Sequence, residues 1–70
     1  MNTIKTDMVF LNTLNAGERF VLRGESTVYV CESRRNGGGM TTIVYRVEGA
    51  DFGPWTFTKP GMTTIYLVSE

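Results

Sequence analysis

The positions of glycine and proline constrain this 70-residue chain most, because they leave only short segments between turns. The segments between the eight glycines and two prolines are rich in threonine, valine, isoleucine and aromatic residues. Such side chains favour extended backbone, whereas good helix formers are scarce: alanine occurs only twice and glutamine not at all. The pattern predicts an all-β fold, a small antiparallel barrel or strongly curled sheet of about five strands.

The turn residues also set the expected boundaries of the strands. The strands are expected at residues 18–23, 27–33, 41–48, 55–58 and 63–69. The first seven residues are largely polar and precede the first apolar segment, so residues 1–7 are expected to form a loose N-terminal tail. Residues 8–70 are too few for more than one core and are expected to make a single small β domain.

Alternation along the strands sorts their side chains into two faces. The face expected to fill the interior consists of Phe20, Leu22, Val28, Val30, Ile43, Tyr45, Val47, Trp55, Phe57, Ile65 and Leu67. The second face contains Val21, Tyr29, Cys31, Val44, Tyr66 and Val68, together with Arg46 and Thr64. The solvent side of an antiparallel sheet is ordinarily polar. This apolar second face therefore predicts a binding site or a subunit contact.

The N-terminal segment 8–14 offers another explanation for the second face. Its secondary structure is ambiguous, because Phe10, Leu11 and Leu14 have helical spacing whereas Val9 and Leu11 have the spacing of a strand. In either form its apolar side chains could fold back and cover the second face. Strong twisting of the strands would also bring both faces partly inside. Cover of the second face by the N-terminal segment and use of that face as an interface are alternatives of equal weight.

Charge and residue inventory exclude several functional classes. Seven basic and seven acidic residues give a net charge of zero, whereas nucleic-acid binders usually carry an excess of positive charge. One cysteine and no histidine exclude an internal disulfide, a Cys/His metal cluster and a Ser-His-Asp triad. The sequence shows neither an apolar run long enough for a membrane span nor a signal peptide. We therefore expect a cytoplasmic protein that is not an enzyme, with no cofactor, metal or membrane association.

The most unusual stretch is Arg34–Gly39, in which two arginines precede Asn36 and three glycines. Flexible backbone N–H groups beside guanidinium groups suit an anion or an acidic partner, although the spacing is not that of a phosphate-binding loop. The Asn36-Gly37 dipeptide is also typical of a solvated hairpin tip. This turn chemistry favours the hairpin interpretation over the anion site.

Three kinds of single residue have both a chemical and a structural interpretation. Trp55 suits a partly exposed binding anchor, but its alternation with Phe57 favours a core tryptophan that closes one end of a barrel. Cys31 lies in mid-strand with no histidine to activate it, so it is expected to be a small apolar core residue. Glu32, Glu48 and Asp51 could form a carboxylate pair for acid–base work or for a hard metal ion, but carboxylates at strand ends are expected to be solvated rather than catalytic.

A short motif at the start of the chain resembles a known group of proteins. It is Phe10-x-x-x-Leu14-x-x-Gly17-x-x-Phe20-Val21-Leu22, followed by Val28-Tyr29-Val30. This half of the chain resembles the opening of small SH3-like barrel proteins from bacteria and their phages. The resemblance implies a small barrel and a binding role, since that mixed group includes adaptors, transcription modulators and phage inhibitors of host enzymes or defences. It carries over no functional residue.

The sequence thus predicts a non-catalytic binding module, such as a small accessory protein or a phage-type inhibitor, that acts by contact with another protein. Self-association into a homo-oligomer is also expected, because two apolar faces on so small a chain gain most by pairing. The alternative is an oligomer that binds a nucleotide-like small molecule at its subunit seams. The residues expected to contact a partner are Arg34, Arg35, Asn36, Tyr29, Val44, Arg46, Tyr66 and Trp55.

Overall fold

The computed structural model describes residues 4–69, with side chains for residues 7–68, as one antiparallel sheet of six strands. The elements are β1 (Ile4–Phe10), the 3-10 turn η1 (Leu11–Thr13), β2 (Arg19–Leu22), β3 (Tyr29–Gly37), β4 (Met40–Val47), β5 (Trp55–Pro60) and β6 (Thr64–Ser69). The strand order is β1-β6-β2-β3-β4-β5. The all-β prediction is confirmed. Because β1 and β5 are both edges, the sheet curls without closing into a barrel.

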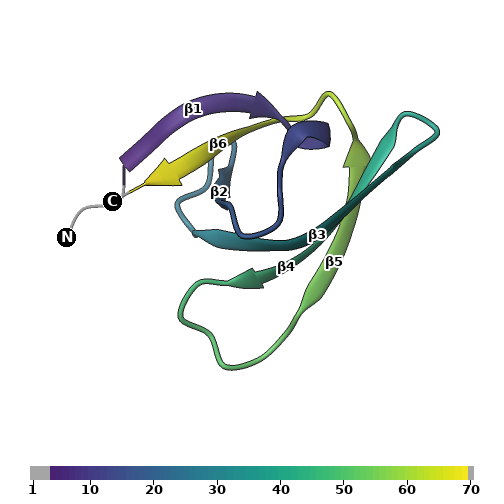
Figure 1. Ribbon diagram of the computed structural model, residues 1–70. Helices are drawn as coiled ribbons and strands as arrows, with labels where there is room; N and C mark the ends of the chain where they lie inside the picture. The colour runs from purple at the N-terminus through teal and green to yellow at the C-terminus, as the bar shows by residue number, and fades with distance from the viewer. Residues whose placement is uncertain (1–3, 70) are drawn as a thin grey trace.

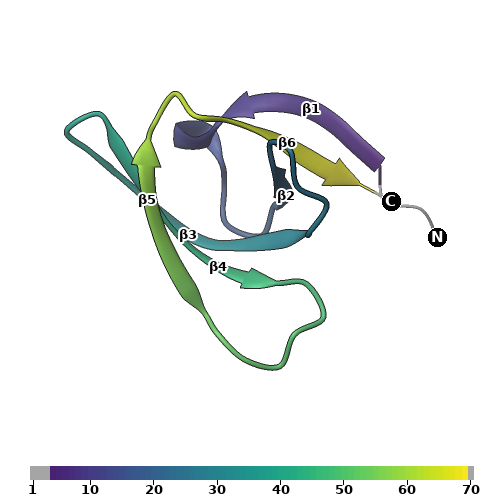
Figure 2. The ribbon, with the colours of Figure 1, turned by 180° about the vertical axis from the view of Figure 1, so that it is seen from behind.

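The curl of the sheet separates two groups of strands. In Figure 1, β1 and β6 lie together on one side of the molecule, β3, β4 and β5 lie on the other, and β2 connects the groups. Figure 2, seen from behind, shows η1 beside the turn between β5 and β6. The amide of Leu11 donates to the carbonyl of Thr63 over 2.8 Å, and that of Asn12 to Gly61 over 3.0 Å. These bonds hold η1 against the sheet at one end of the core.

The core lies on the inner, concave face of the sheet. Its buried residues are Leu11, Leu14, Phe20, Cys31, Ile43 and Ile65. Leu11 and Leu14 belong to the N-terminal segment and are completely buried, whereas Met8 and Phe10 on the preceding strand are 61% and 44% exposed. The N-terminal segment therefore supplies core to the inner face and does not cover the second face, because η1 turns both leucines beneath the sheet.

The predicted N-terminal tail is wrong for residues 4–7, which belong to β1. β1 pairs antiparallel with β6, and Ile4 lies opposite Ser69. An edge strand with solvent along its free side tolerates polar residues well, so polarity did not distinguish this strand from a tail. The part of the predicted tail at residues 1–3 lies outside the described residues.

β3 corrects the predicted assignment of side chains to faces. Phe20 lies opposite Tyr29, and Cys31 lies opposite Tyr45. Side chains of directly opposed residues project to the same face of a sheet. Tyr29 and Cys31 therefore face the core with Phe20 and Tyr45, and Val30 projects outward. Alternation within β3 separates its two sets of side chains, but only the register with β2 and β4 decides which set is inside.

Candidate functional site

Six aromatic side chains form a continuous row on the inner face, from the buried core to the solvent. From β2 to the loop before β5, this aromatic row consists of Phe20, Tyr29, Tyr45, Phe57, Trp55 and Phe52. Successive contacting rings have centroids between 5.2 and 6.1 Å apart. Phe20 is completely buried, whereas Trp55 is 36% and Phe52 67% exposed. The exposed end of the row is thus supported by rings that continue into the core.

Tyr45 is the centre of the aromatic row. Its ring meets that of Tyr29 edge-on at 5.2 Å and 87°, and lies 5.3 Å from Phe57 and 6.1 Å from Trp55. β4 and β5 produce this arrangement because Tyr45 lies opposite Trp55 and Ile43 opposite Phe57 in their regular register. Edge-on and tilted contacts of this kind stabilise ring pairs beyond the burial of their area. Tyr45 therefore contacts three of the other five rings and connects the exposed part of the row to the core.

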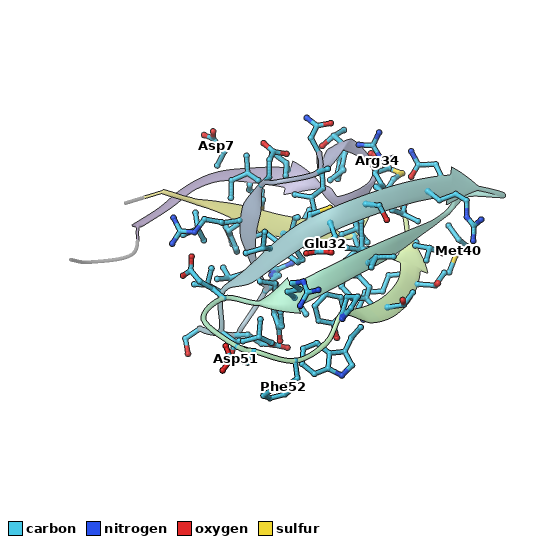
Figure 3. All side chains as sticks on the ribbon, turned by 60° about the horizontal axis from the view of Figure 1, so that its bottom comes forward. Asp7, Glu32, Arg34, Met40, Asp51 and Phe52 are labelled. Carbon is cyan, nitrogen blue, oxygen red and sulfur yellow. The ribbon has the colours of Figure 1, made fainter. Side chains whose placement is uncertain are left out.

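The loop between β4 and β5 is shaped around the indole of Trp55. Phe52 meets this indole edge-on, at 5.3 Å and 86°. Gly53 has a φ of +105°, and a Cβ atom there would lie 2.9 Å from Cε3 and Cζ3 of Trp55. Only glycine fits at this position without moving the ring. Figure 3 shows Asp51 and Phe52 projecting from this loop at the end of the molecule.

The polar groups beside the aromatic row are mostly acidic. The Tyr29 hydroxyl donates to Oε1 of Glu25 over 2.9 Å, and burial together with this hydrogen bond raises the pKa of Tyr29. Glu48 accepts two hydrogen bonds from the guanidinium of Arg19, at 2.6 and 3.1 Å. Asp51 is exposed and directly precedes Phe52. Glu25 and Asp51 thus place carboxylates next to Tyr29 and Phe52, whereas the charge of Glu48 is paired with that of Arg19.

Lys59 places a positive charge beside the aromatic row. Its Nζ lies 6.0 Å from the centroid of the Phe57 ring, at the limit of a cation–π contact. Trp55, Phe57 and Lys59 occupy alternate positions of β5, so all three lie on the same side of this edge strand. β5 therefore carries two aromatic rings and one positive charge in a line along the open edge of the inner face.

The Arg34–Gly39 stretch forms the end of the β3–β4 hairpin, as its turn chemistry predicted. The strands continue further than expected, and Gly37 pairs with Met40. Gly38 and Gly39 make the two-residue turn, with φ values of +60° and +78°. Positive φ at both central positions is the requirement of the tight hairpin turn that matches the twist of the strands. The turn therefore lies two residues later than the Asn36-Gly37 dipeptide indicated.

Arg34 and Asn36 bind the chain's own backbone. Nη1 of Arg34 donates to the carbonyl of Leu14 over 2.7 Å. Nδ2 of Asn36 donates to the carbonyl of Asn12 over 3.3 Å, and its Oδ1 accepts from the hydroxyl of Thr41 over 2.7 Å. Both side chains point inward because the register of β3 shifts between Cys31 and Ser33. They attach the η1 region to the hairpin.

A hollow of about 240 Å³ lies beside this attachment, at the end of the core away from Phe52 and Trp55. It is lined by Asn12, Asn36, Gly37, Gly39, Met40, Thr41, Gly61 and Met62. A Cβ atom at Gly61 would lie 3.1 Å from Oγ1 of Thr41 and from Cβ of Asn12, so Gly61 lies close against these two side chains. The Asn36 amide is already bonded within the chain. Met62, at the rim, is highly exposed.

The second face is largely covered within one chain, which corrects its prediction as a broad apolar contact surface. Val21 and Val68 are buried there, and Val44 and Tyr66 are half-buried. Nε of Arg46 lies 2.7 Å from a carboxylate oxygen of Glu32 in an ion pair. The strong curl of the sheet brings part of both faces inside, as the twist alternative anticipated.

The eight residues predicted to contact a partner lie in four places. Tyr29 and Trp55 belong to the aromatic row, Arg34 and Asn36 attach the hairpin to η1, Arg35, Val44 and Arg46 lie on the outer face of β3 and β4, and Tyr66 lies on the outer face of β6. Figure 3 shows Arg34 and Phe52 far apart, near opposite edges of the molecule. Within this set, Tyr29 and Trp55 share the aromatic row, and Arg35 and Val44 line one hollow on the outer face.

Sequence reasoning did not single out Phe52, Phe57 and Lys59 as a group. The alternation Trp55-x-Phe57-x-Lys59 was the available signal, because alternate residues of a strand share a face. Phe52 lies in the loop between β4 and β5, where periodicity has no meaning. Its contact with Trp55 depends on the path of the loop around Gly53.

Three residues that the sequence offered for chemistry, Cys31, Glu32 and Glu48, are buried or held in ion pairs. Burial raises the pKa of the Cys31 thiol, which lies in the core and is a poor nucleophile in that state. Glu32 and Glu48 each form an ion pair with a different arginine. Residues 4–69 contain no group of three or more potential metal ligands. Over the same residues, no helix has the length and apolar character that crossing a membrane requires.

Comparison of this chain with protein-family models, with curated proteins and with solved structures finds no match. The resemblance to SH3-like barrels therefore stays a prediction.

Proposed function

We propose that this chain is a non-catalytic binding module that holds a protein partner through the exposed end of its aromatic row. The observation that carries the proposal is the Phe52–Trp55 pair, whose rings reach solvent while the contacts of Trp55 with Tyr45 continue to the core. Tryptophan is enriched among the few residues that supply most of the binding energy of protein interfaces. An anchor that is already packed loses little side-chain entropy when it binds.

The charges around the row favour a polypeptide over a nucleic acid or a nucleotide. Asp51 lies next to Phe52, and Glu25 is hydrogen-bonded to Tyr29. The phosphates of a nucleotide whose base stacked on this row would approach these carboxylates, whereas affinity for nucleic acid depends on neutralising phosphates with basic residues. A protein segment with apolar side chains avoids this repulsion. The finer predictions, an accessory protein or phage-type inhibitor and a homo-oligomer, stay predictions.

Selection from a random peptide library tests the proposal. The library is selected on the wild-type protein and counter-selected on the Phe52→Ser/Trp55→Ser variant, and the affinity of each enriched peptide is measured by fluorescence anisotropy. We expect Phe52→Ala to weaken binding by at least about tenfold, as truncation of an interface anchor does. Met62→Ala is the matched control, because Met62 is equally exposed but lies at the other end of the molecule.

Two results would overturn the proposal. One is a selection in which the wild type enriches no peptide beyond those that also bind the counter-selection variant. The other is a set of enriched peptides whose affinities are equal for the wild type, Phe52→Ala and Met62→Ala. Circular dichroism of each variant confirms that a loss of affinity does not reflect unfolding.

A further inference from the structure

β5 is an edge strand with a regular hydrogen-bonding pattern. It pairs with β4 over six consecutive residue pairs, from Met40–Pro60 to Tyr45–Trp55, with no register shift. The amide of Gly61 donates to the carbonyl of Gly39 over 2.9 Å, which sets the phase of the ladder. In an antiparallel pair, alternate residues then direct their amide and carbonyl groups toward the neighbouring strand. Trp55, Phe57 and Lys59 bond β4 in this way.

The intervening residues, Thr56 and Thr58, therefore direct their backbone amides and carbonyls to the free edge. Both residues are exposed, and β5 ends the strand order on this side. Their side chains lie on the outer face, where the hydroxyls of Thr58 and Thr42 are 2.8 Å apart. The edge of β5 thus offers two donors and two acceptors at the spacing of a strand.

The other edge of the sheet is less suited to pairing. The register of β1 with β6 shifts between Lys5 and Met8, in the middle of the strand. Such an irregularity bends a strand and interrupts the ladder that a further strand would need. β5 has no such interruption, and its inner side carries the exposed part of the aromatic row.

We infer that the edge of β5 binds an extended segment of the partner protein, which adds to the sheet as a seventh, antiparallel strand. This inference rests on the proposed function and specifies the form of the partner. Main-chain hydrogen bonds to Thr56 and Thr58 hold the segment, and the contacts of its alternate side chains with β5 determine which sequences bind. The antiparallel direction continues the pattern of the whole sheet and gives the more stable ladder.

The side chains of β5 define the sequence of this segment. Directly opposed residues of paired strands share a face, so three alternate residues of the segment lie against Lys59, Phe57 and Trp55. Lys59 favours an acidic residue, and the rings of Phe57 and Trp55 favour large apolar residues. Read from its N-terminus, the antiparallel segment is acidic–x–apolar–x–apolar, where x is any residue with a free amide.

A synthetic peptide, acetyl-Thr-Asp-Thr-Leu-Thr-Leu-Thr-amide, is the probe. The amide of the threonine between aspartate and the first leucine lies opposite Thr58 and donates to it. N-methylation of this threonine removes that hydrogen bond, whereas N-methylation of the first leucine, opposite Phe57, alters an amide that points away from β5. The two methylated peptides have the same composition and differ only in the edge contact.

A matched pair of protein variants tests a second bond of the same edge, from the Thr56 amide to the carbonyl of the peptide threonine opposite it. Thr56→Pro removes an amide that β4 does not use, and proline is tolerated at such edge positions. Thr56→Val keeps this amide and the β-branched shape. We expect the unmodified peptide to slow hydrogen exchange of the Thr56 and Thr58 amides in the wild type. We expect a loss of at least about fivefold in affinity from Thr56→Pro and from threonine methylation, with Thr56→Val and leucine methylation neutral.

Three other outcomes would overturn the inference, and they distinguish its failure from failure of the proposed function. A peptide that shifts the Trp55 and Phe52 resonances without protecting the Thr56 amide, and binds Thr56→Pro as tightly as the wild type, rejects strand addition but supports the aromatic site. A probe peptide that does not bind the wild type also rejects the inference, while the library selection still decides the proposed function. A free protein that sediments as a dimer dissociated by Thr56→Pro would assign the edge to a second copy.

Discussion

The guanidinium of Arg34 donates a hydrogen bond to the carbonyl of Leu14 over 2.7 Å, which connects the C-terminal half of β3 to the residue that follows η1. Arg34→Met should therefore lower the free energy of unfolding by about 1 to 2 kcal/mol, since it leaves a partly buried carbonyl without its charged donor. Arg35→Met is the control, because Arg35 lies opposite Thr42 and projects to the other side of the same strand. Urea denaturation of both variants measures the difference, and equal stabilities would show that the contact is dispensable.

Leu11 tests the contribution of the N-terminal segment to the core. Leu11→Ala removes a completely buried side chain and should cost about 2 to 5 kcal/mol in the free energy of unfolding. Met8→Ala, on the exposed side of β1, should cost less than about 0.5 kcal/mol. Thermal and urea denaturation measure both changes. A small effect of Leu11→Ala would contradict the position of η1 beneath the sheet.

Gly53 and Trp55 test the geometry of the exposed aromatic pair. Gly53→Ala places a methyl group against the indole, so it should displace the ring and shift Trp55 fluorescence to longer wavelength. The emission reports Trp55 alone, since the chain contains one tryptophan. Gly49→Ala is the control: Gly49 also has a positive φ, but a Cβ atom there would meet no other atom within 4 Å. Both variants should lose about 1 kcal/mol to backbone strain, and only Gly53→Ala should change the emission.

Tyr29 should make the protein less stable at alkaline pH. Burial and the hydrogen bond to Glu25 raise the pKa of Tyr29, so the folded state retains this proton after the unfolded state has lost it. Stability is therefore fully present below the ordinary tyrosine pKa of about 10 and falls as the pH rises through the higher pKa of the folded state. Tyr29→Phe should flatten this decline. Urea denaturation at a series of pH values from neutral to alkaline measures the slope.

Glu25→Gln separates the two causes of the Tyr29 shift. Removal of the carboxylate should lower the pKa of Tyr29 toward its ordinary value while the part caused by burial remains. A titration of tyrosine labelled at Cζ, followed by carbon NMR, measures this pKa directly. An unchanged pKa in Glu25→Gln would show that the Tyr29–Glu25 hydrogen bond does not persist in solution.

The strand content and most turns could be read from the sequence because their causes are local. β-Branched and aromatic residues favour extension wherever they occur, and glycine permits the positive φ of a tight turn independently of the rest of the fold. β4 at Met40–Val47 and β6 at Thr64–Ser69 therefore lie within one residue of their predicted positions. The hairpin between β3 and β4 was also anticipated, although its turn is at Gly38 and Gly39.

Tertiary structure alone decided which residues meet. β1 became a strand because the distant β6 offered it an edge, and Tyr29 faces the core because of its register with Phe20. The exposed aromatic pair likewise joins a loop residue, Phe52, to the first residue of β5. Pairing partners and register depend on contacts between segments far apart in the chain, so no local pattern contains them. For the same reason, the sequence-based prediction of contact residues did not include all the residues of the aromatic row.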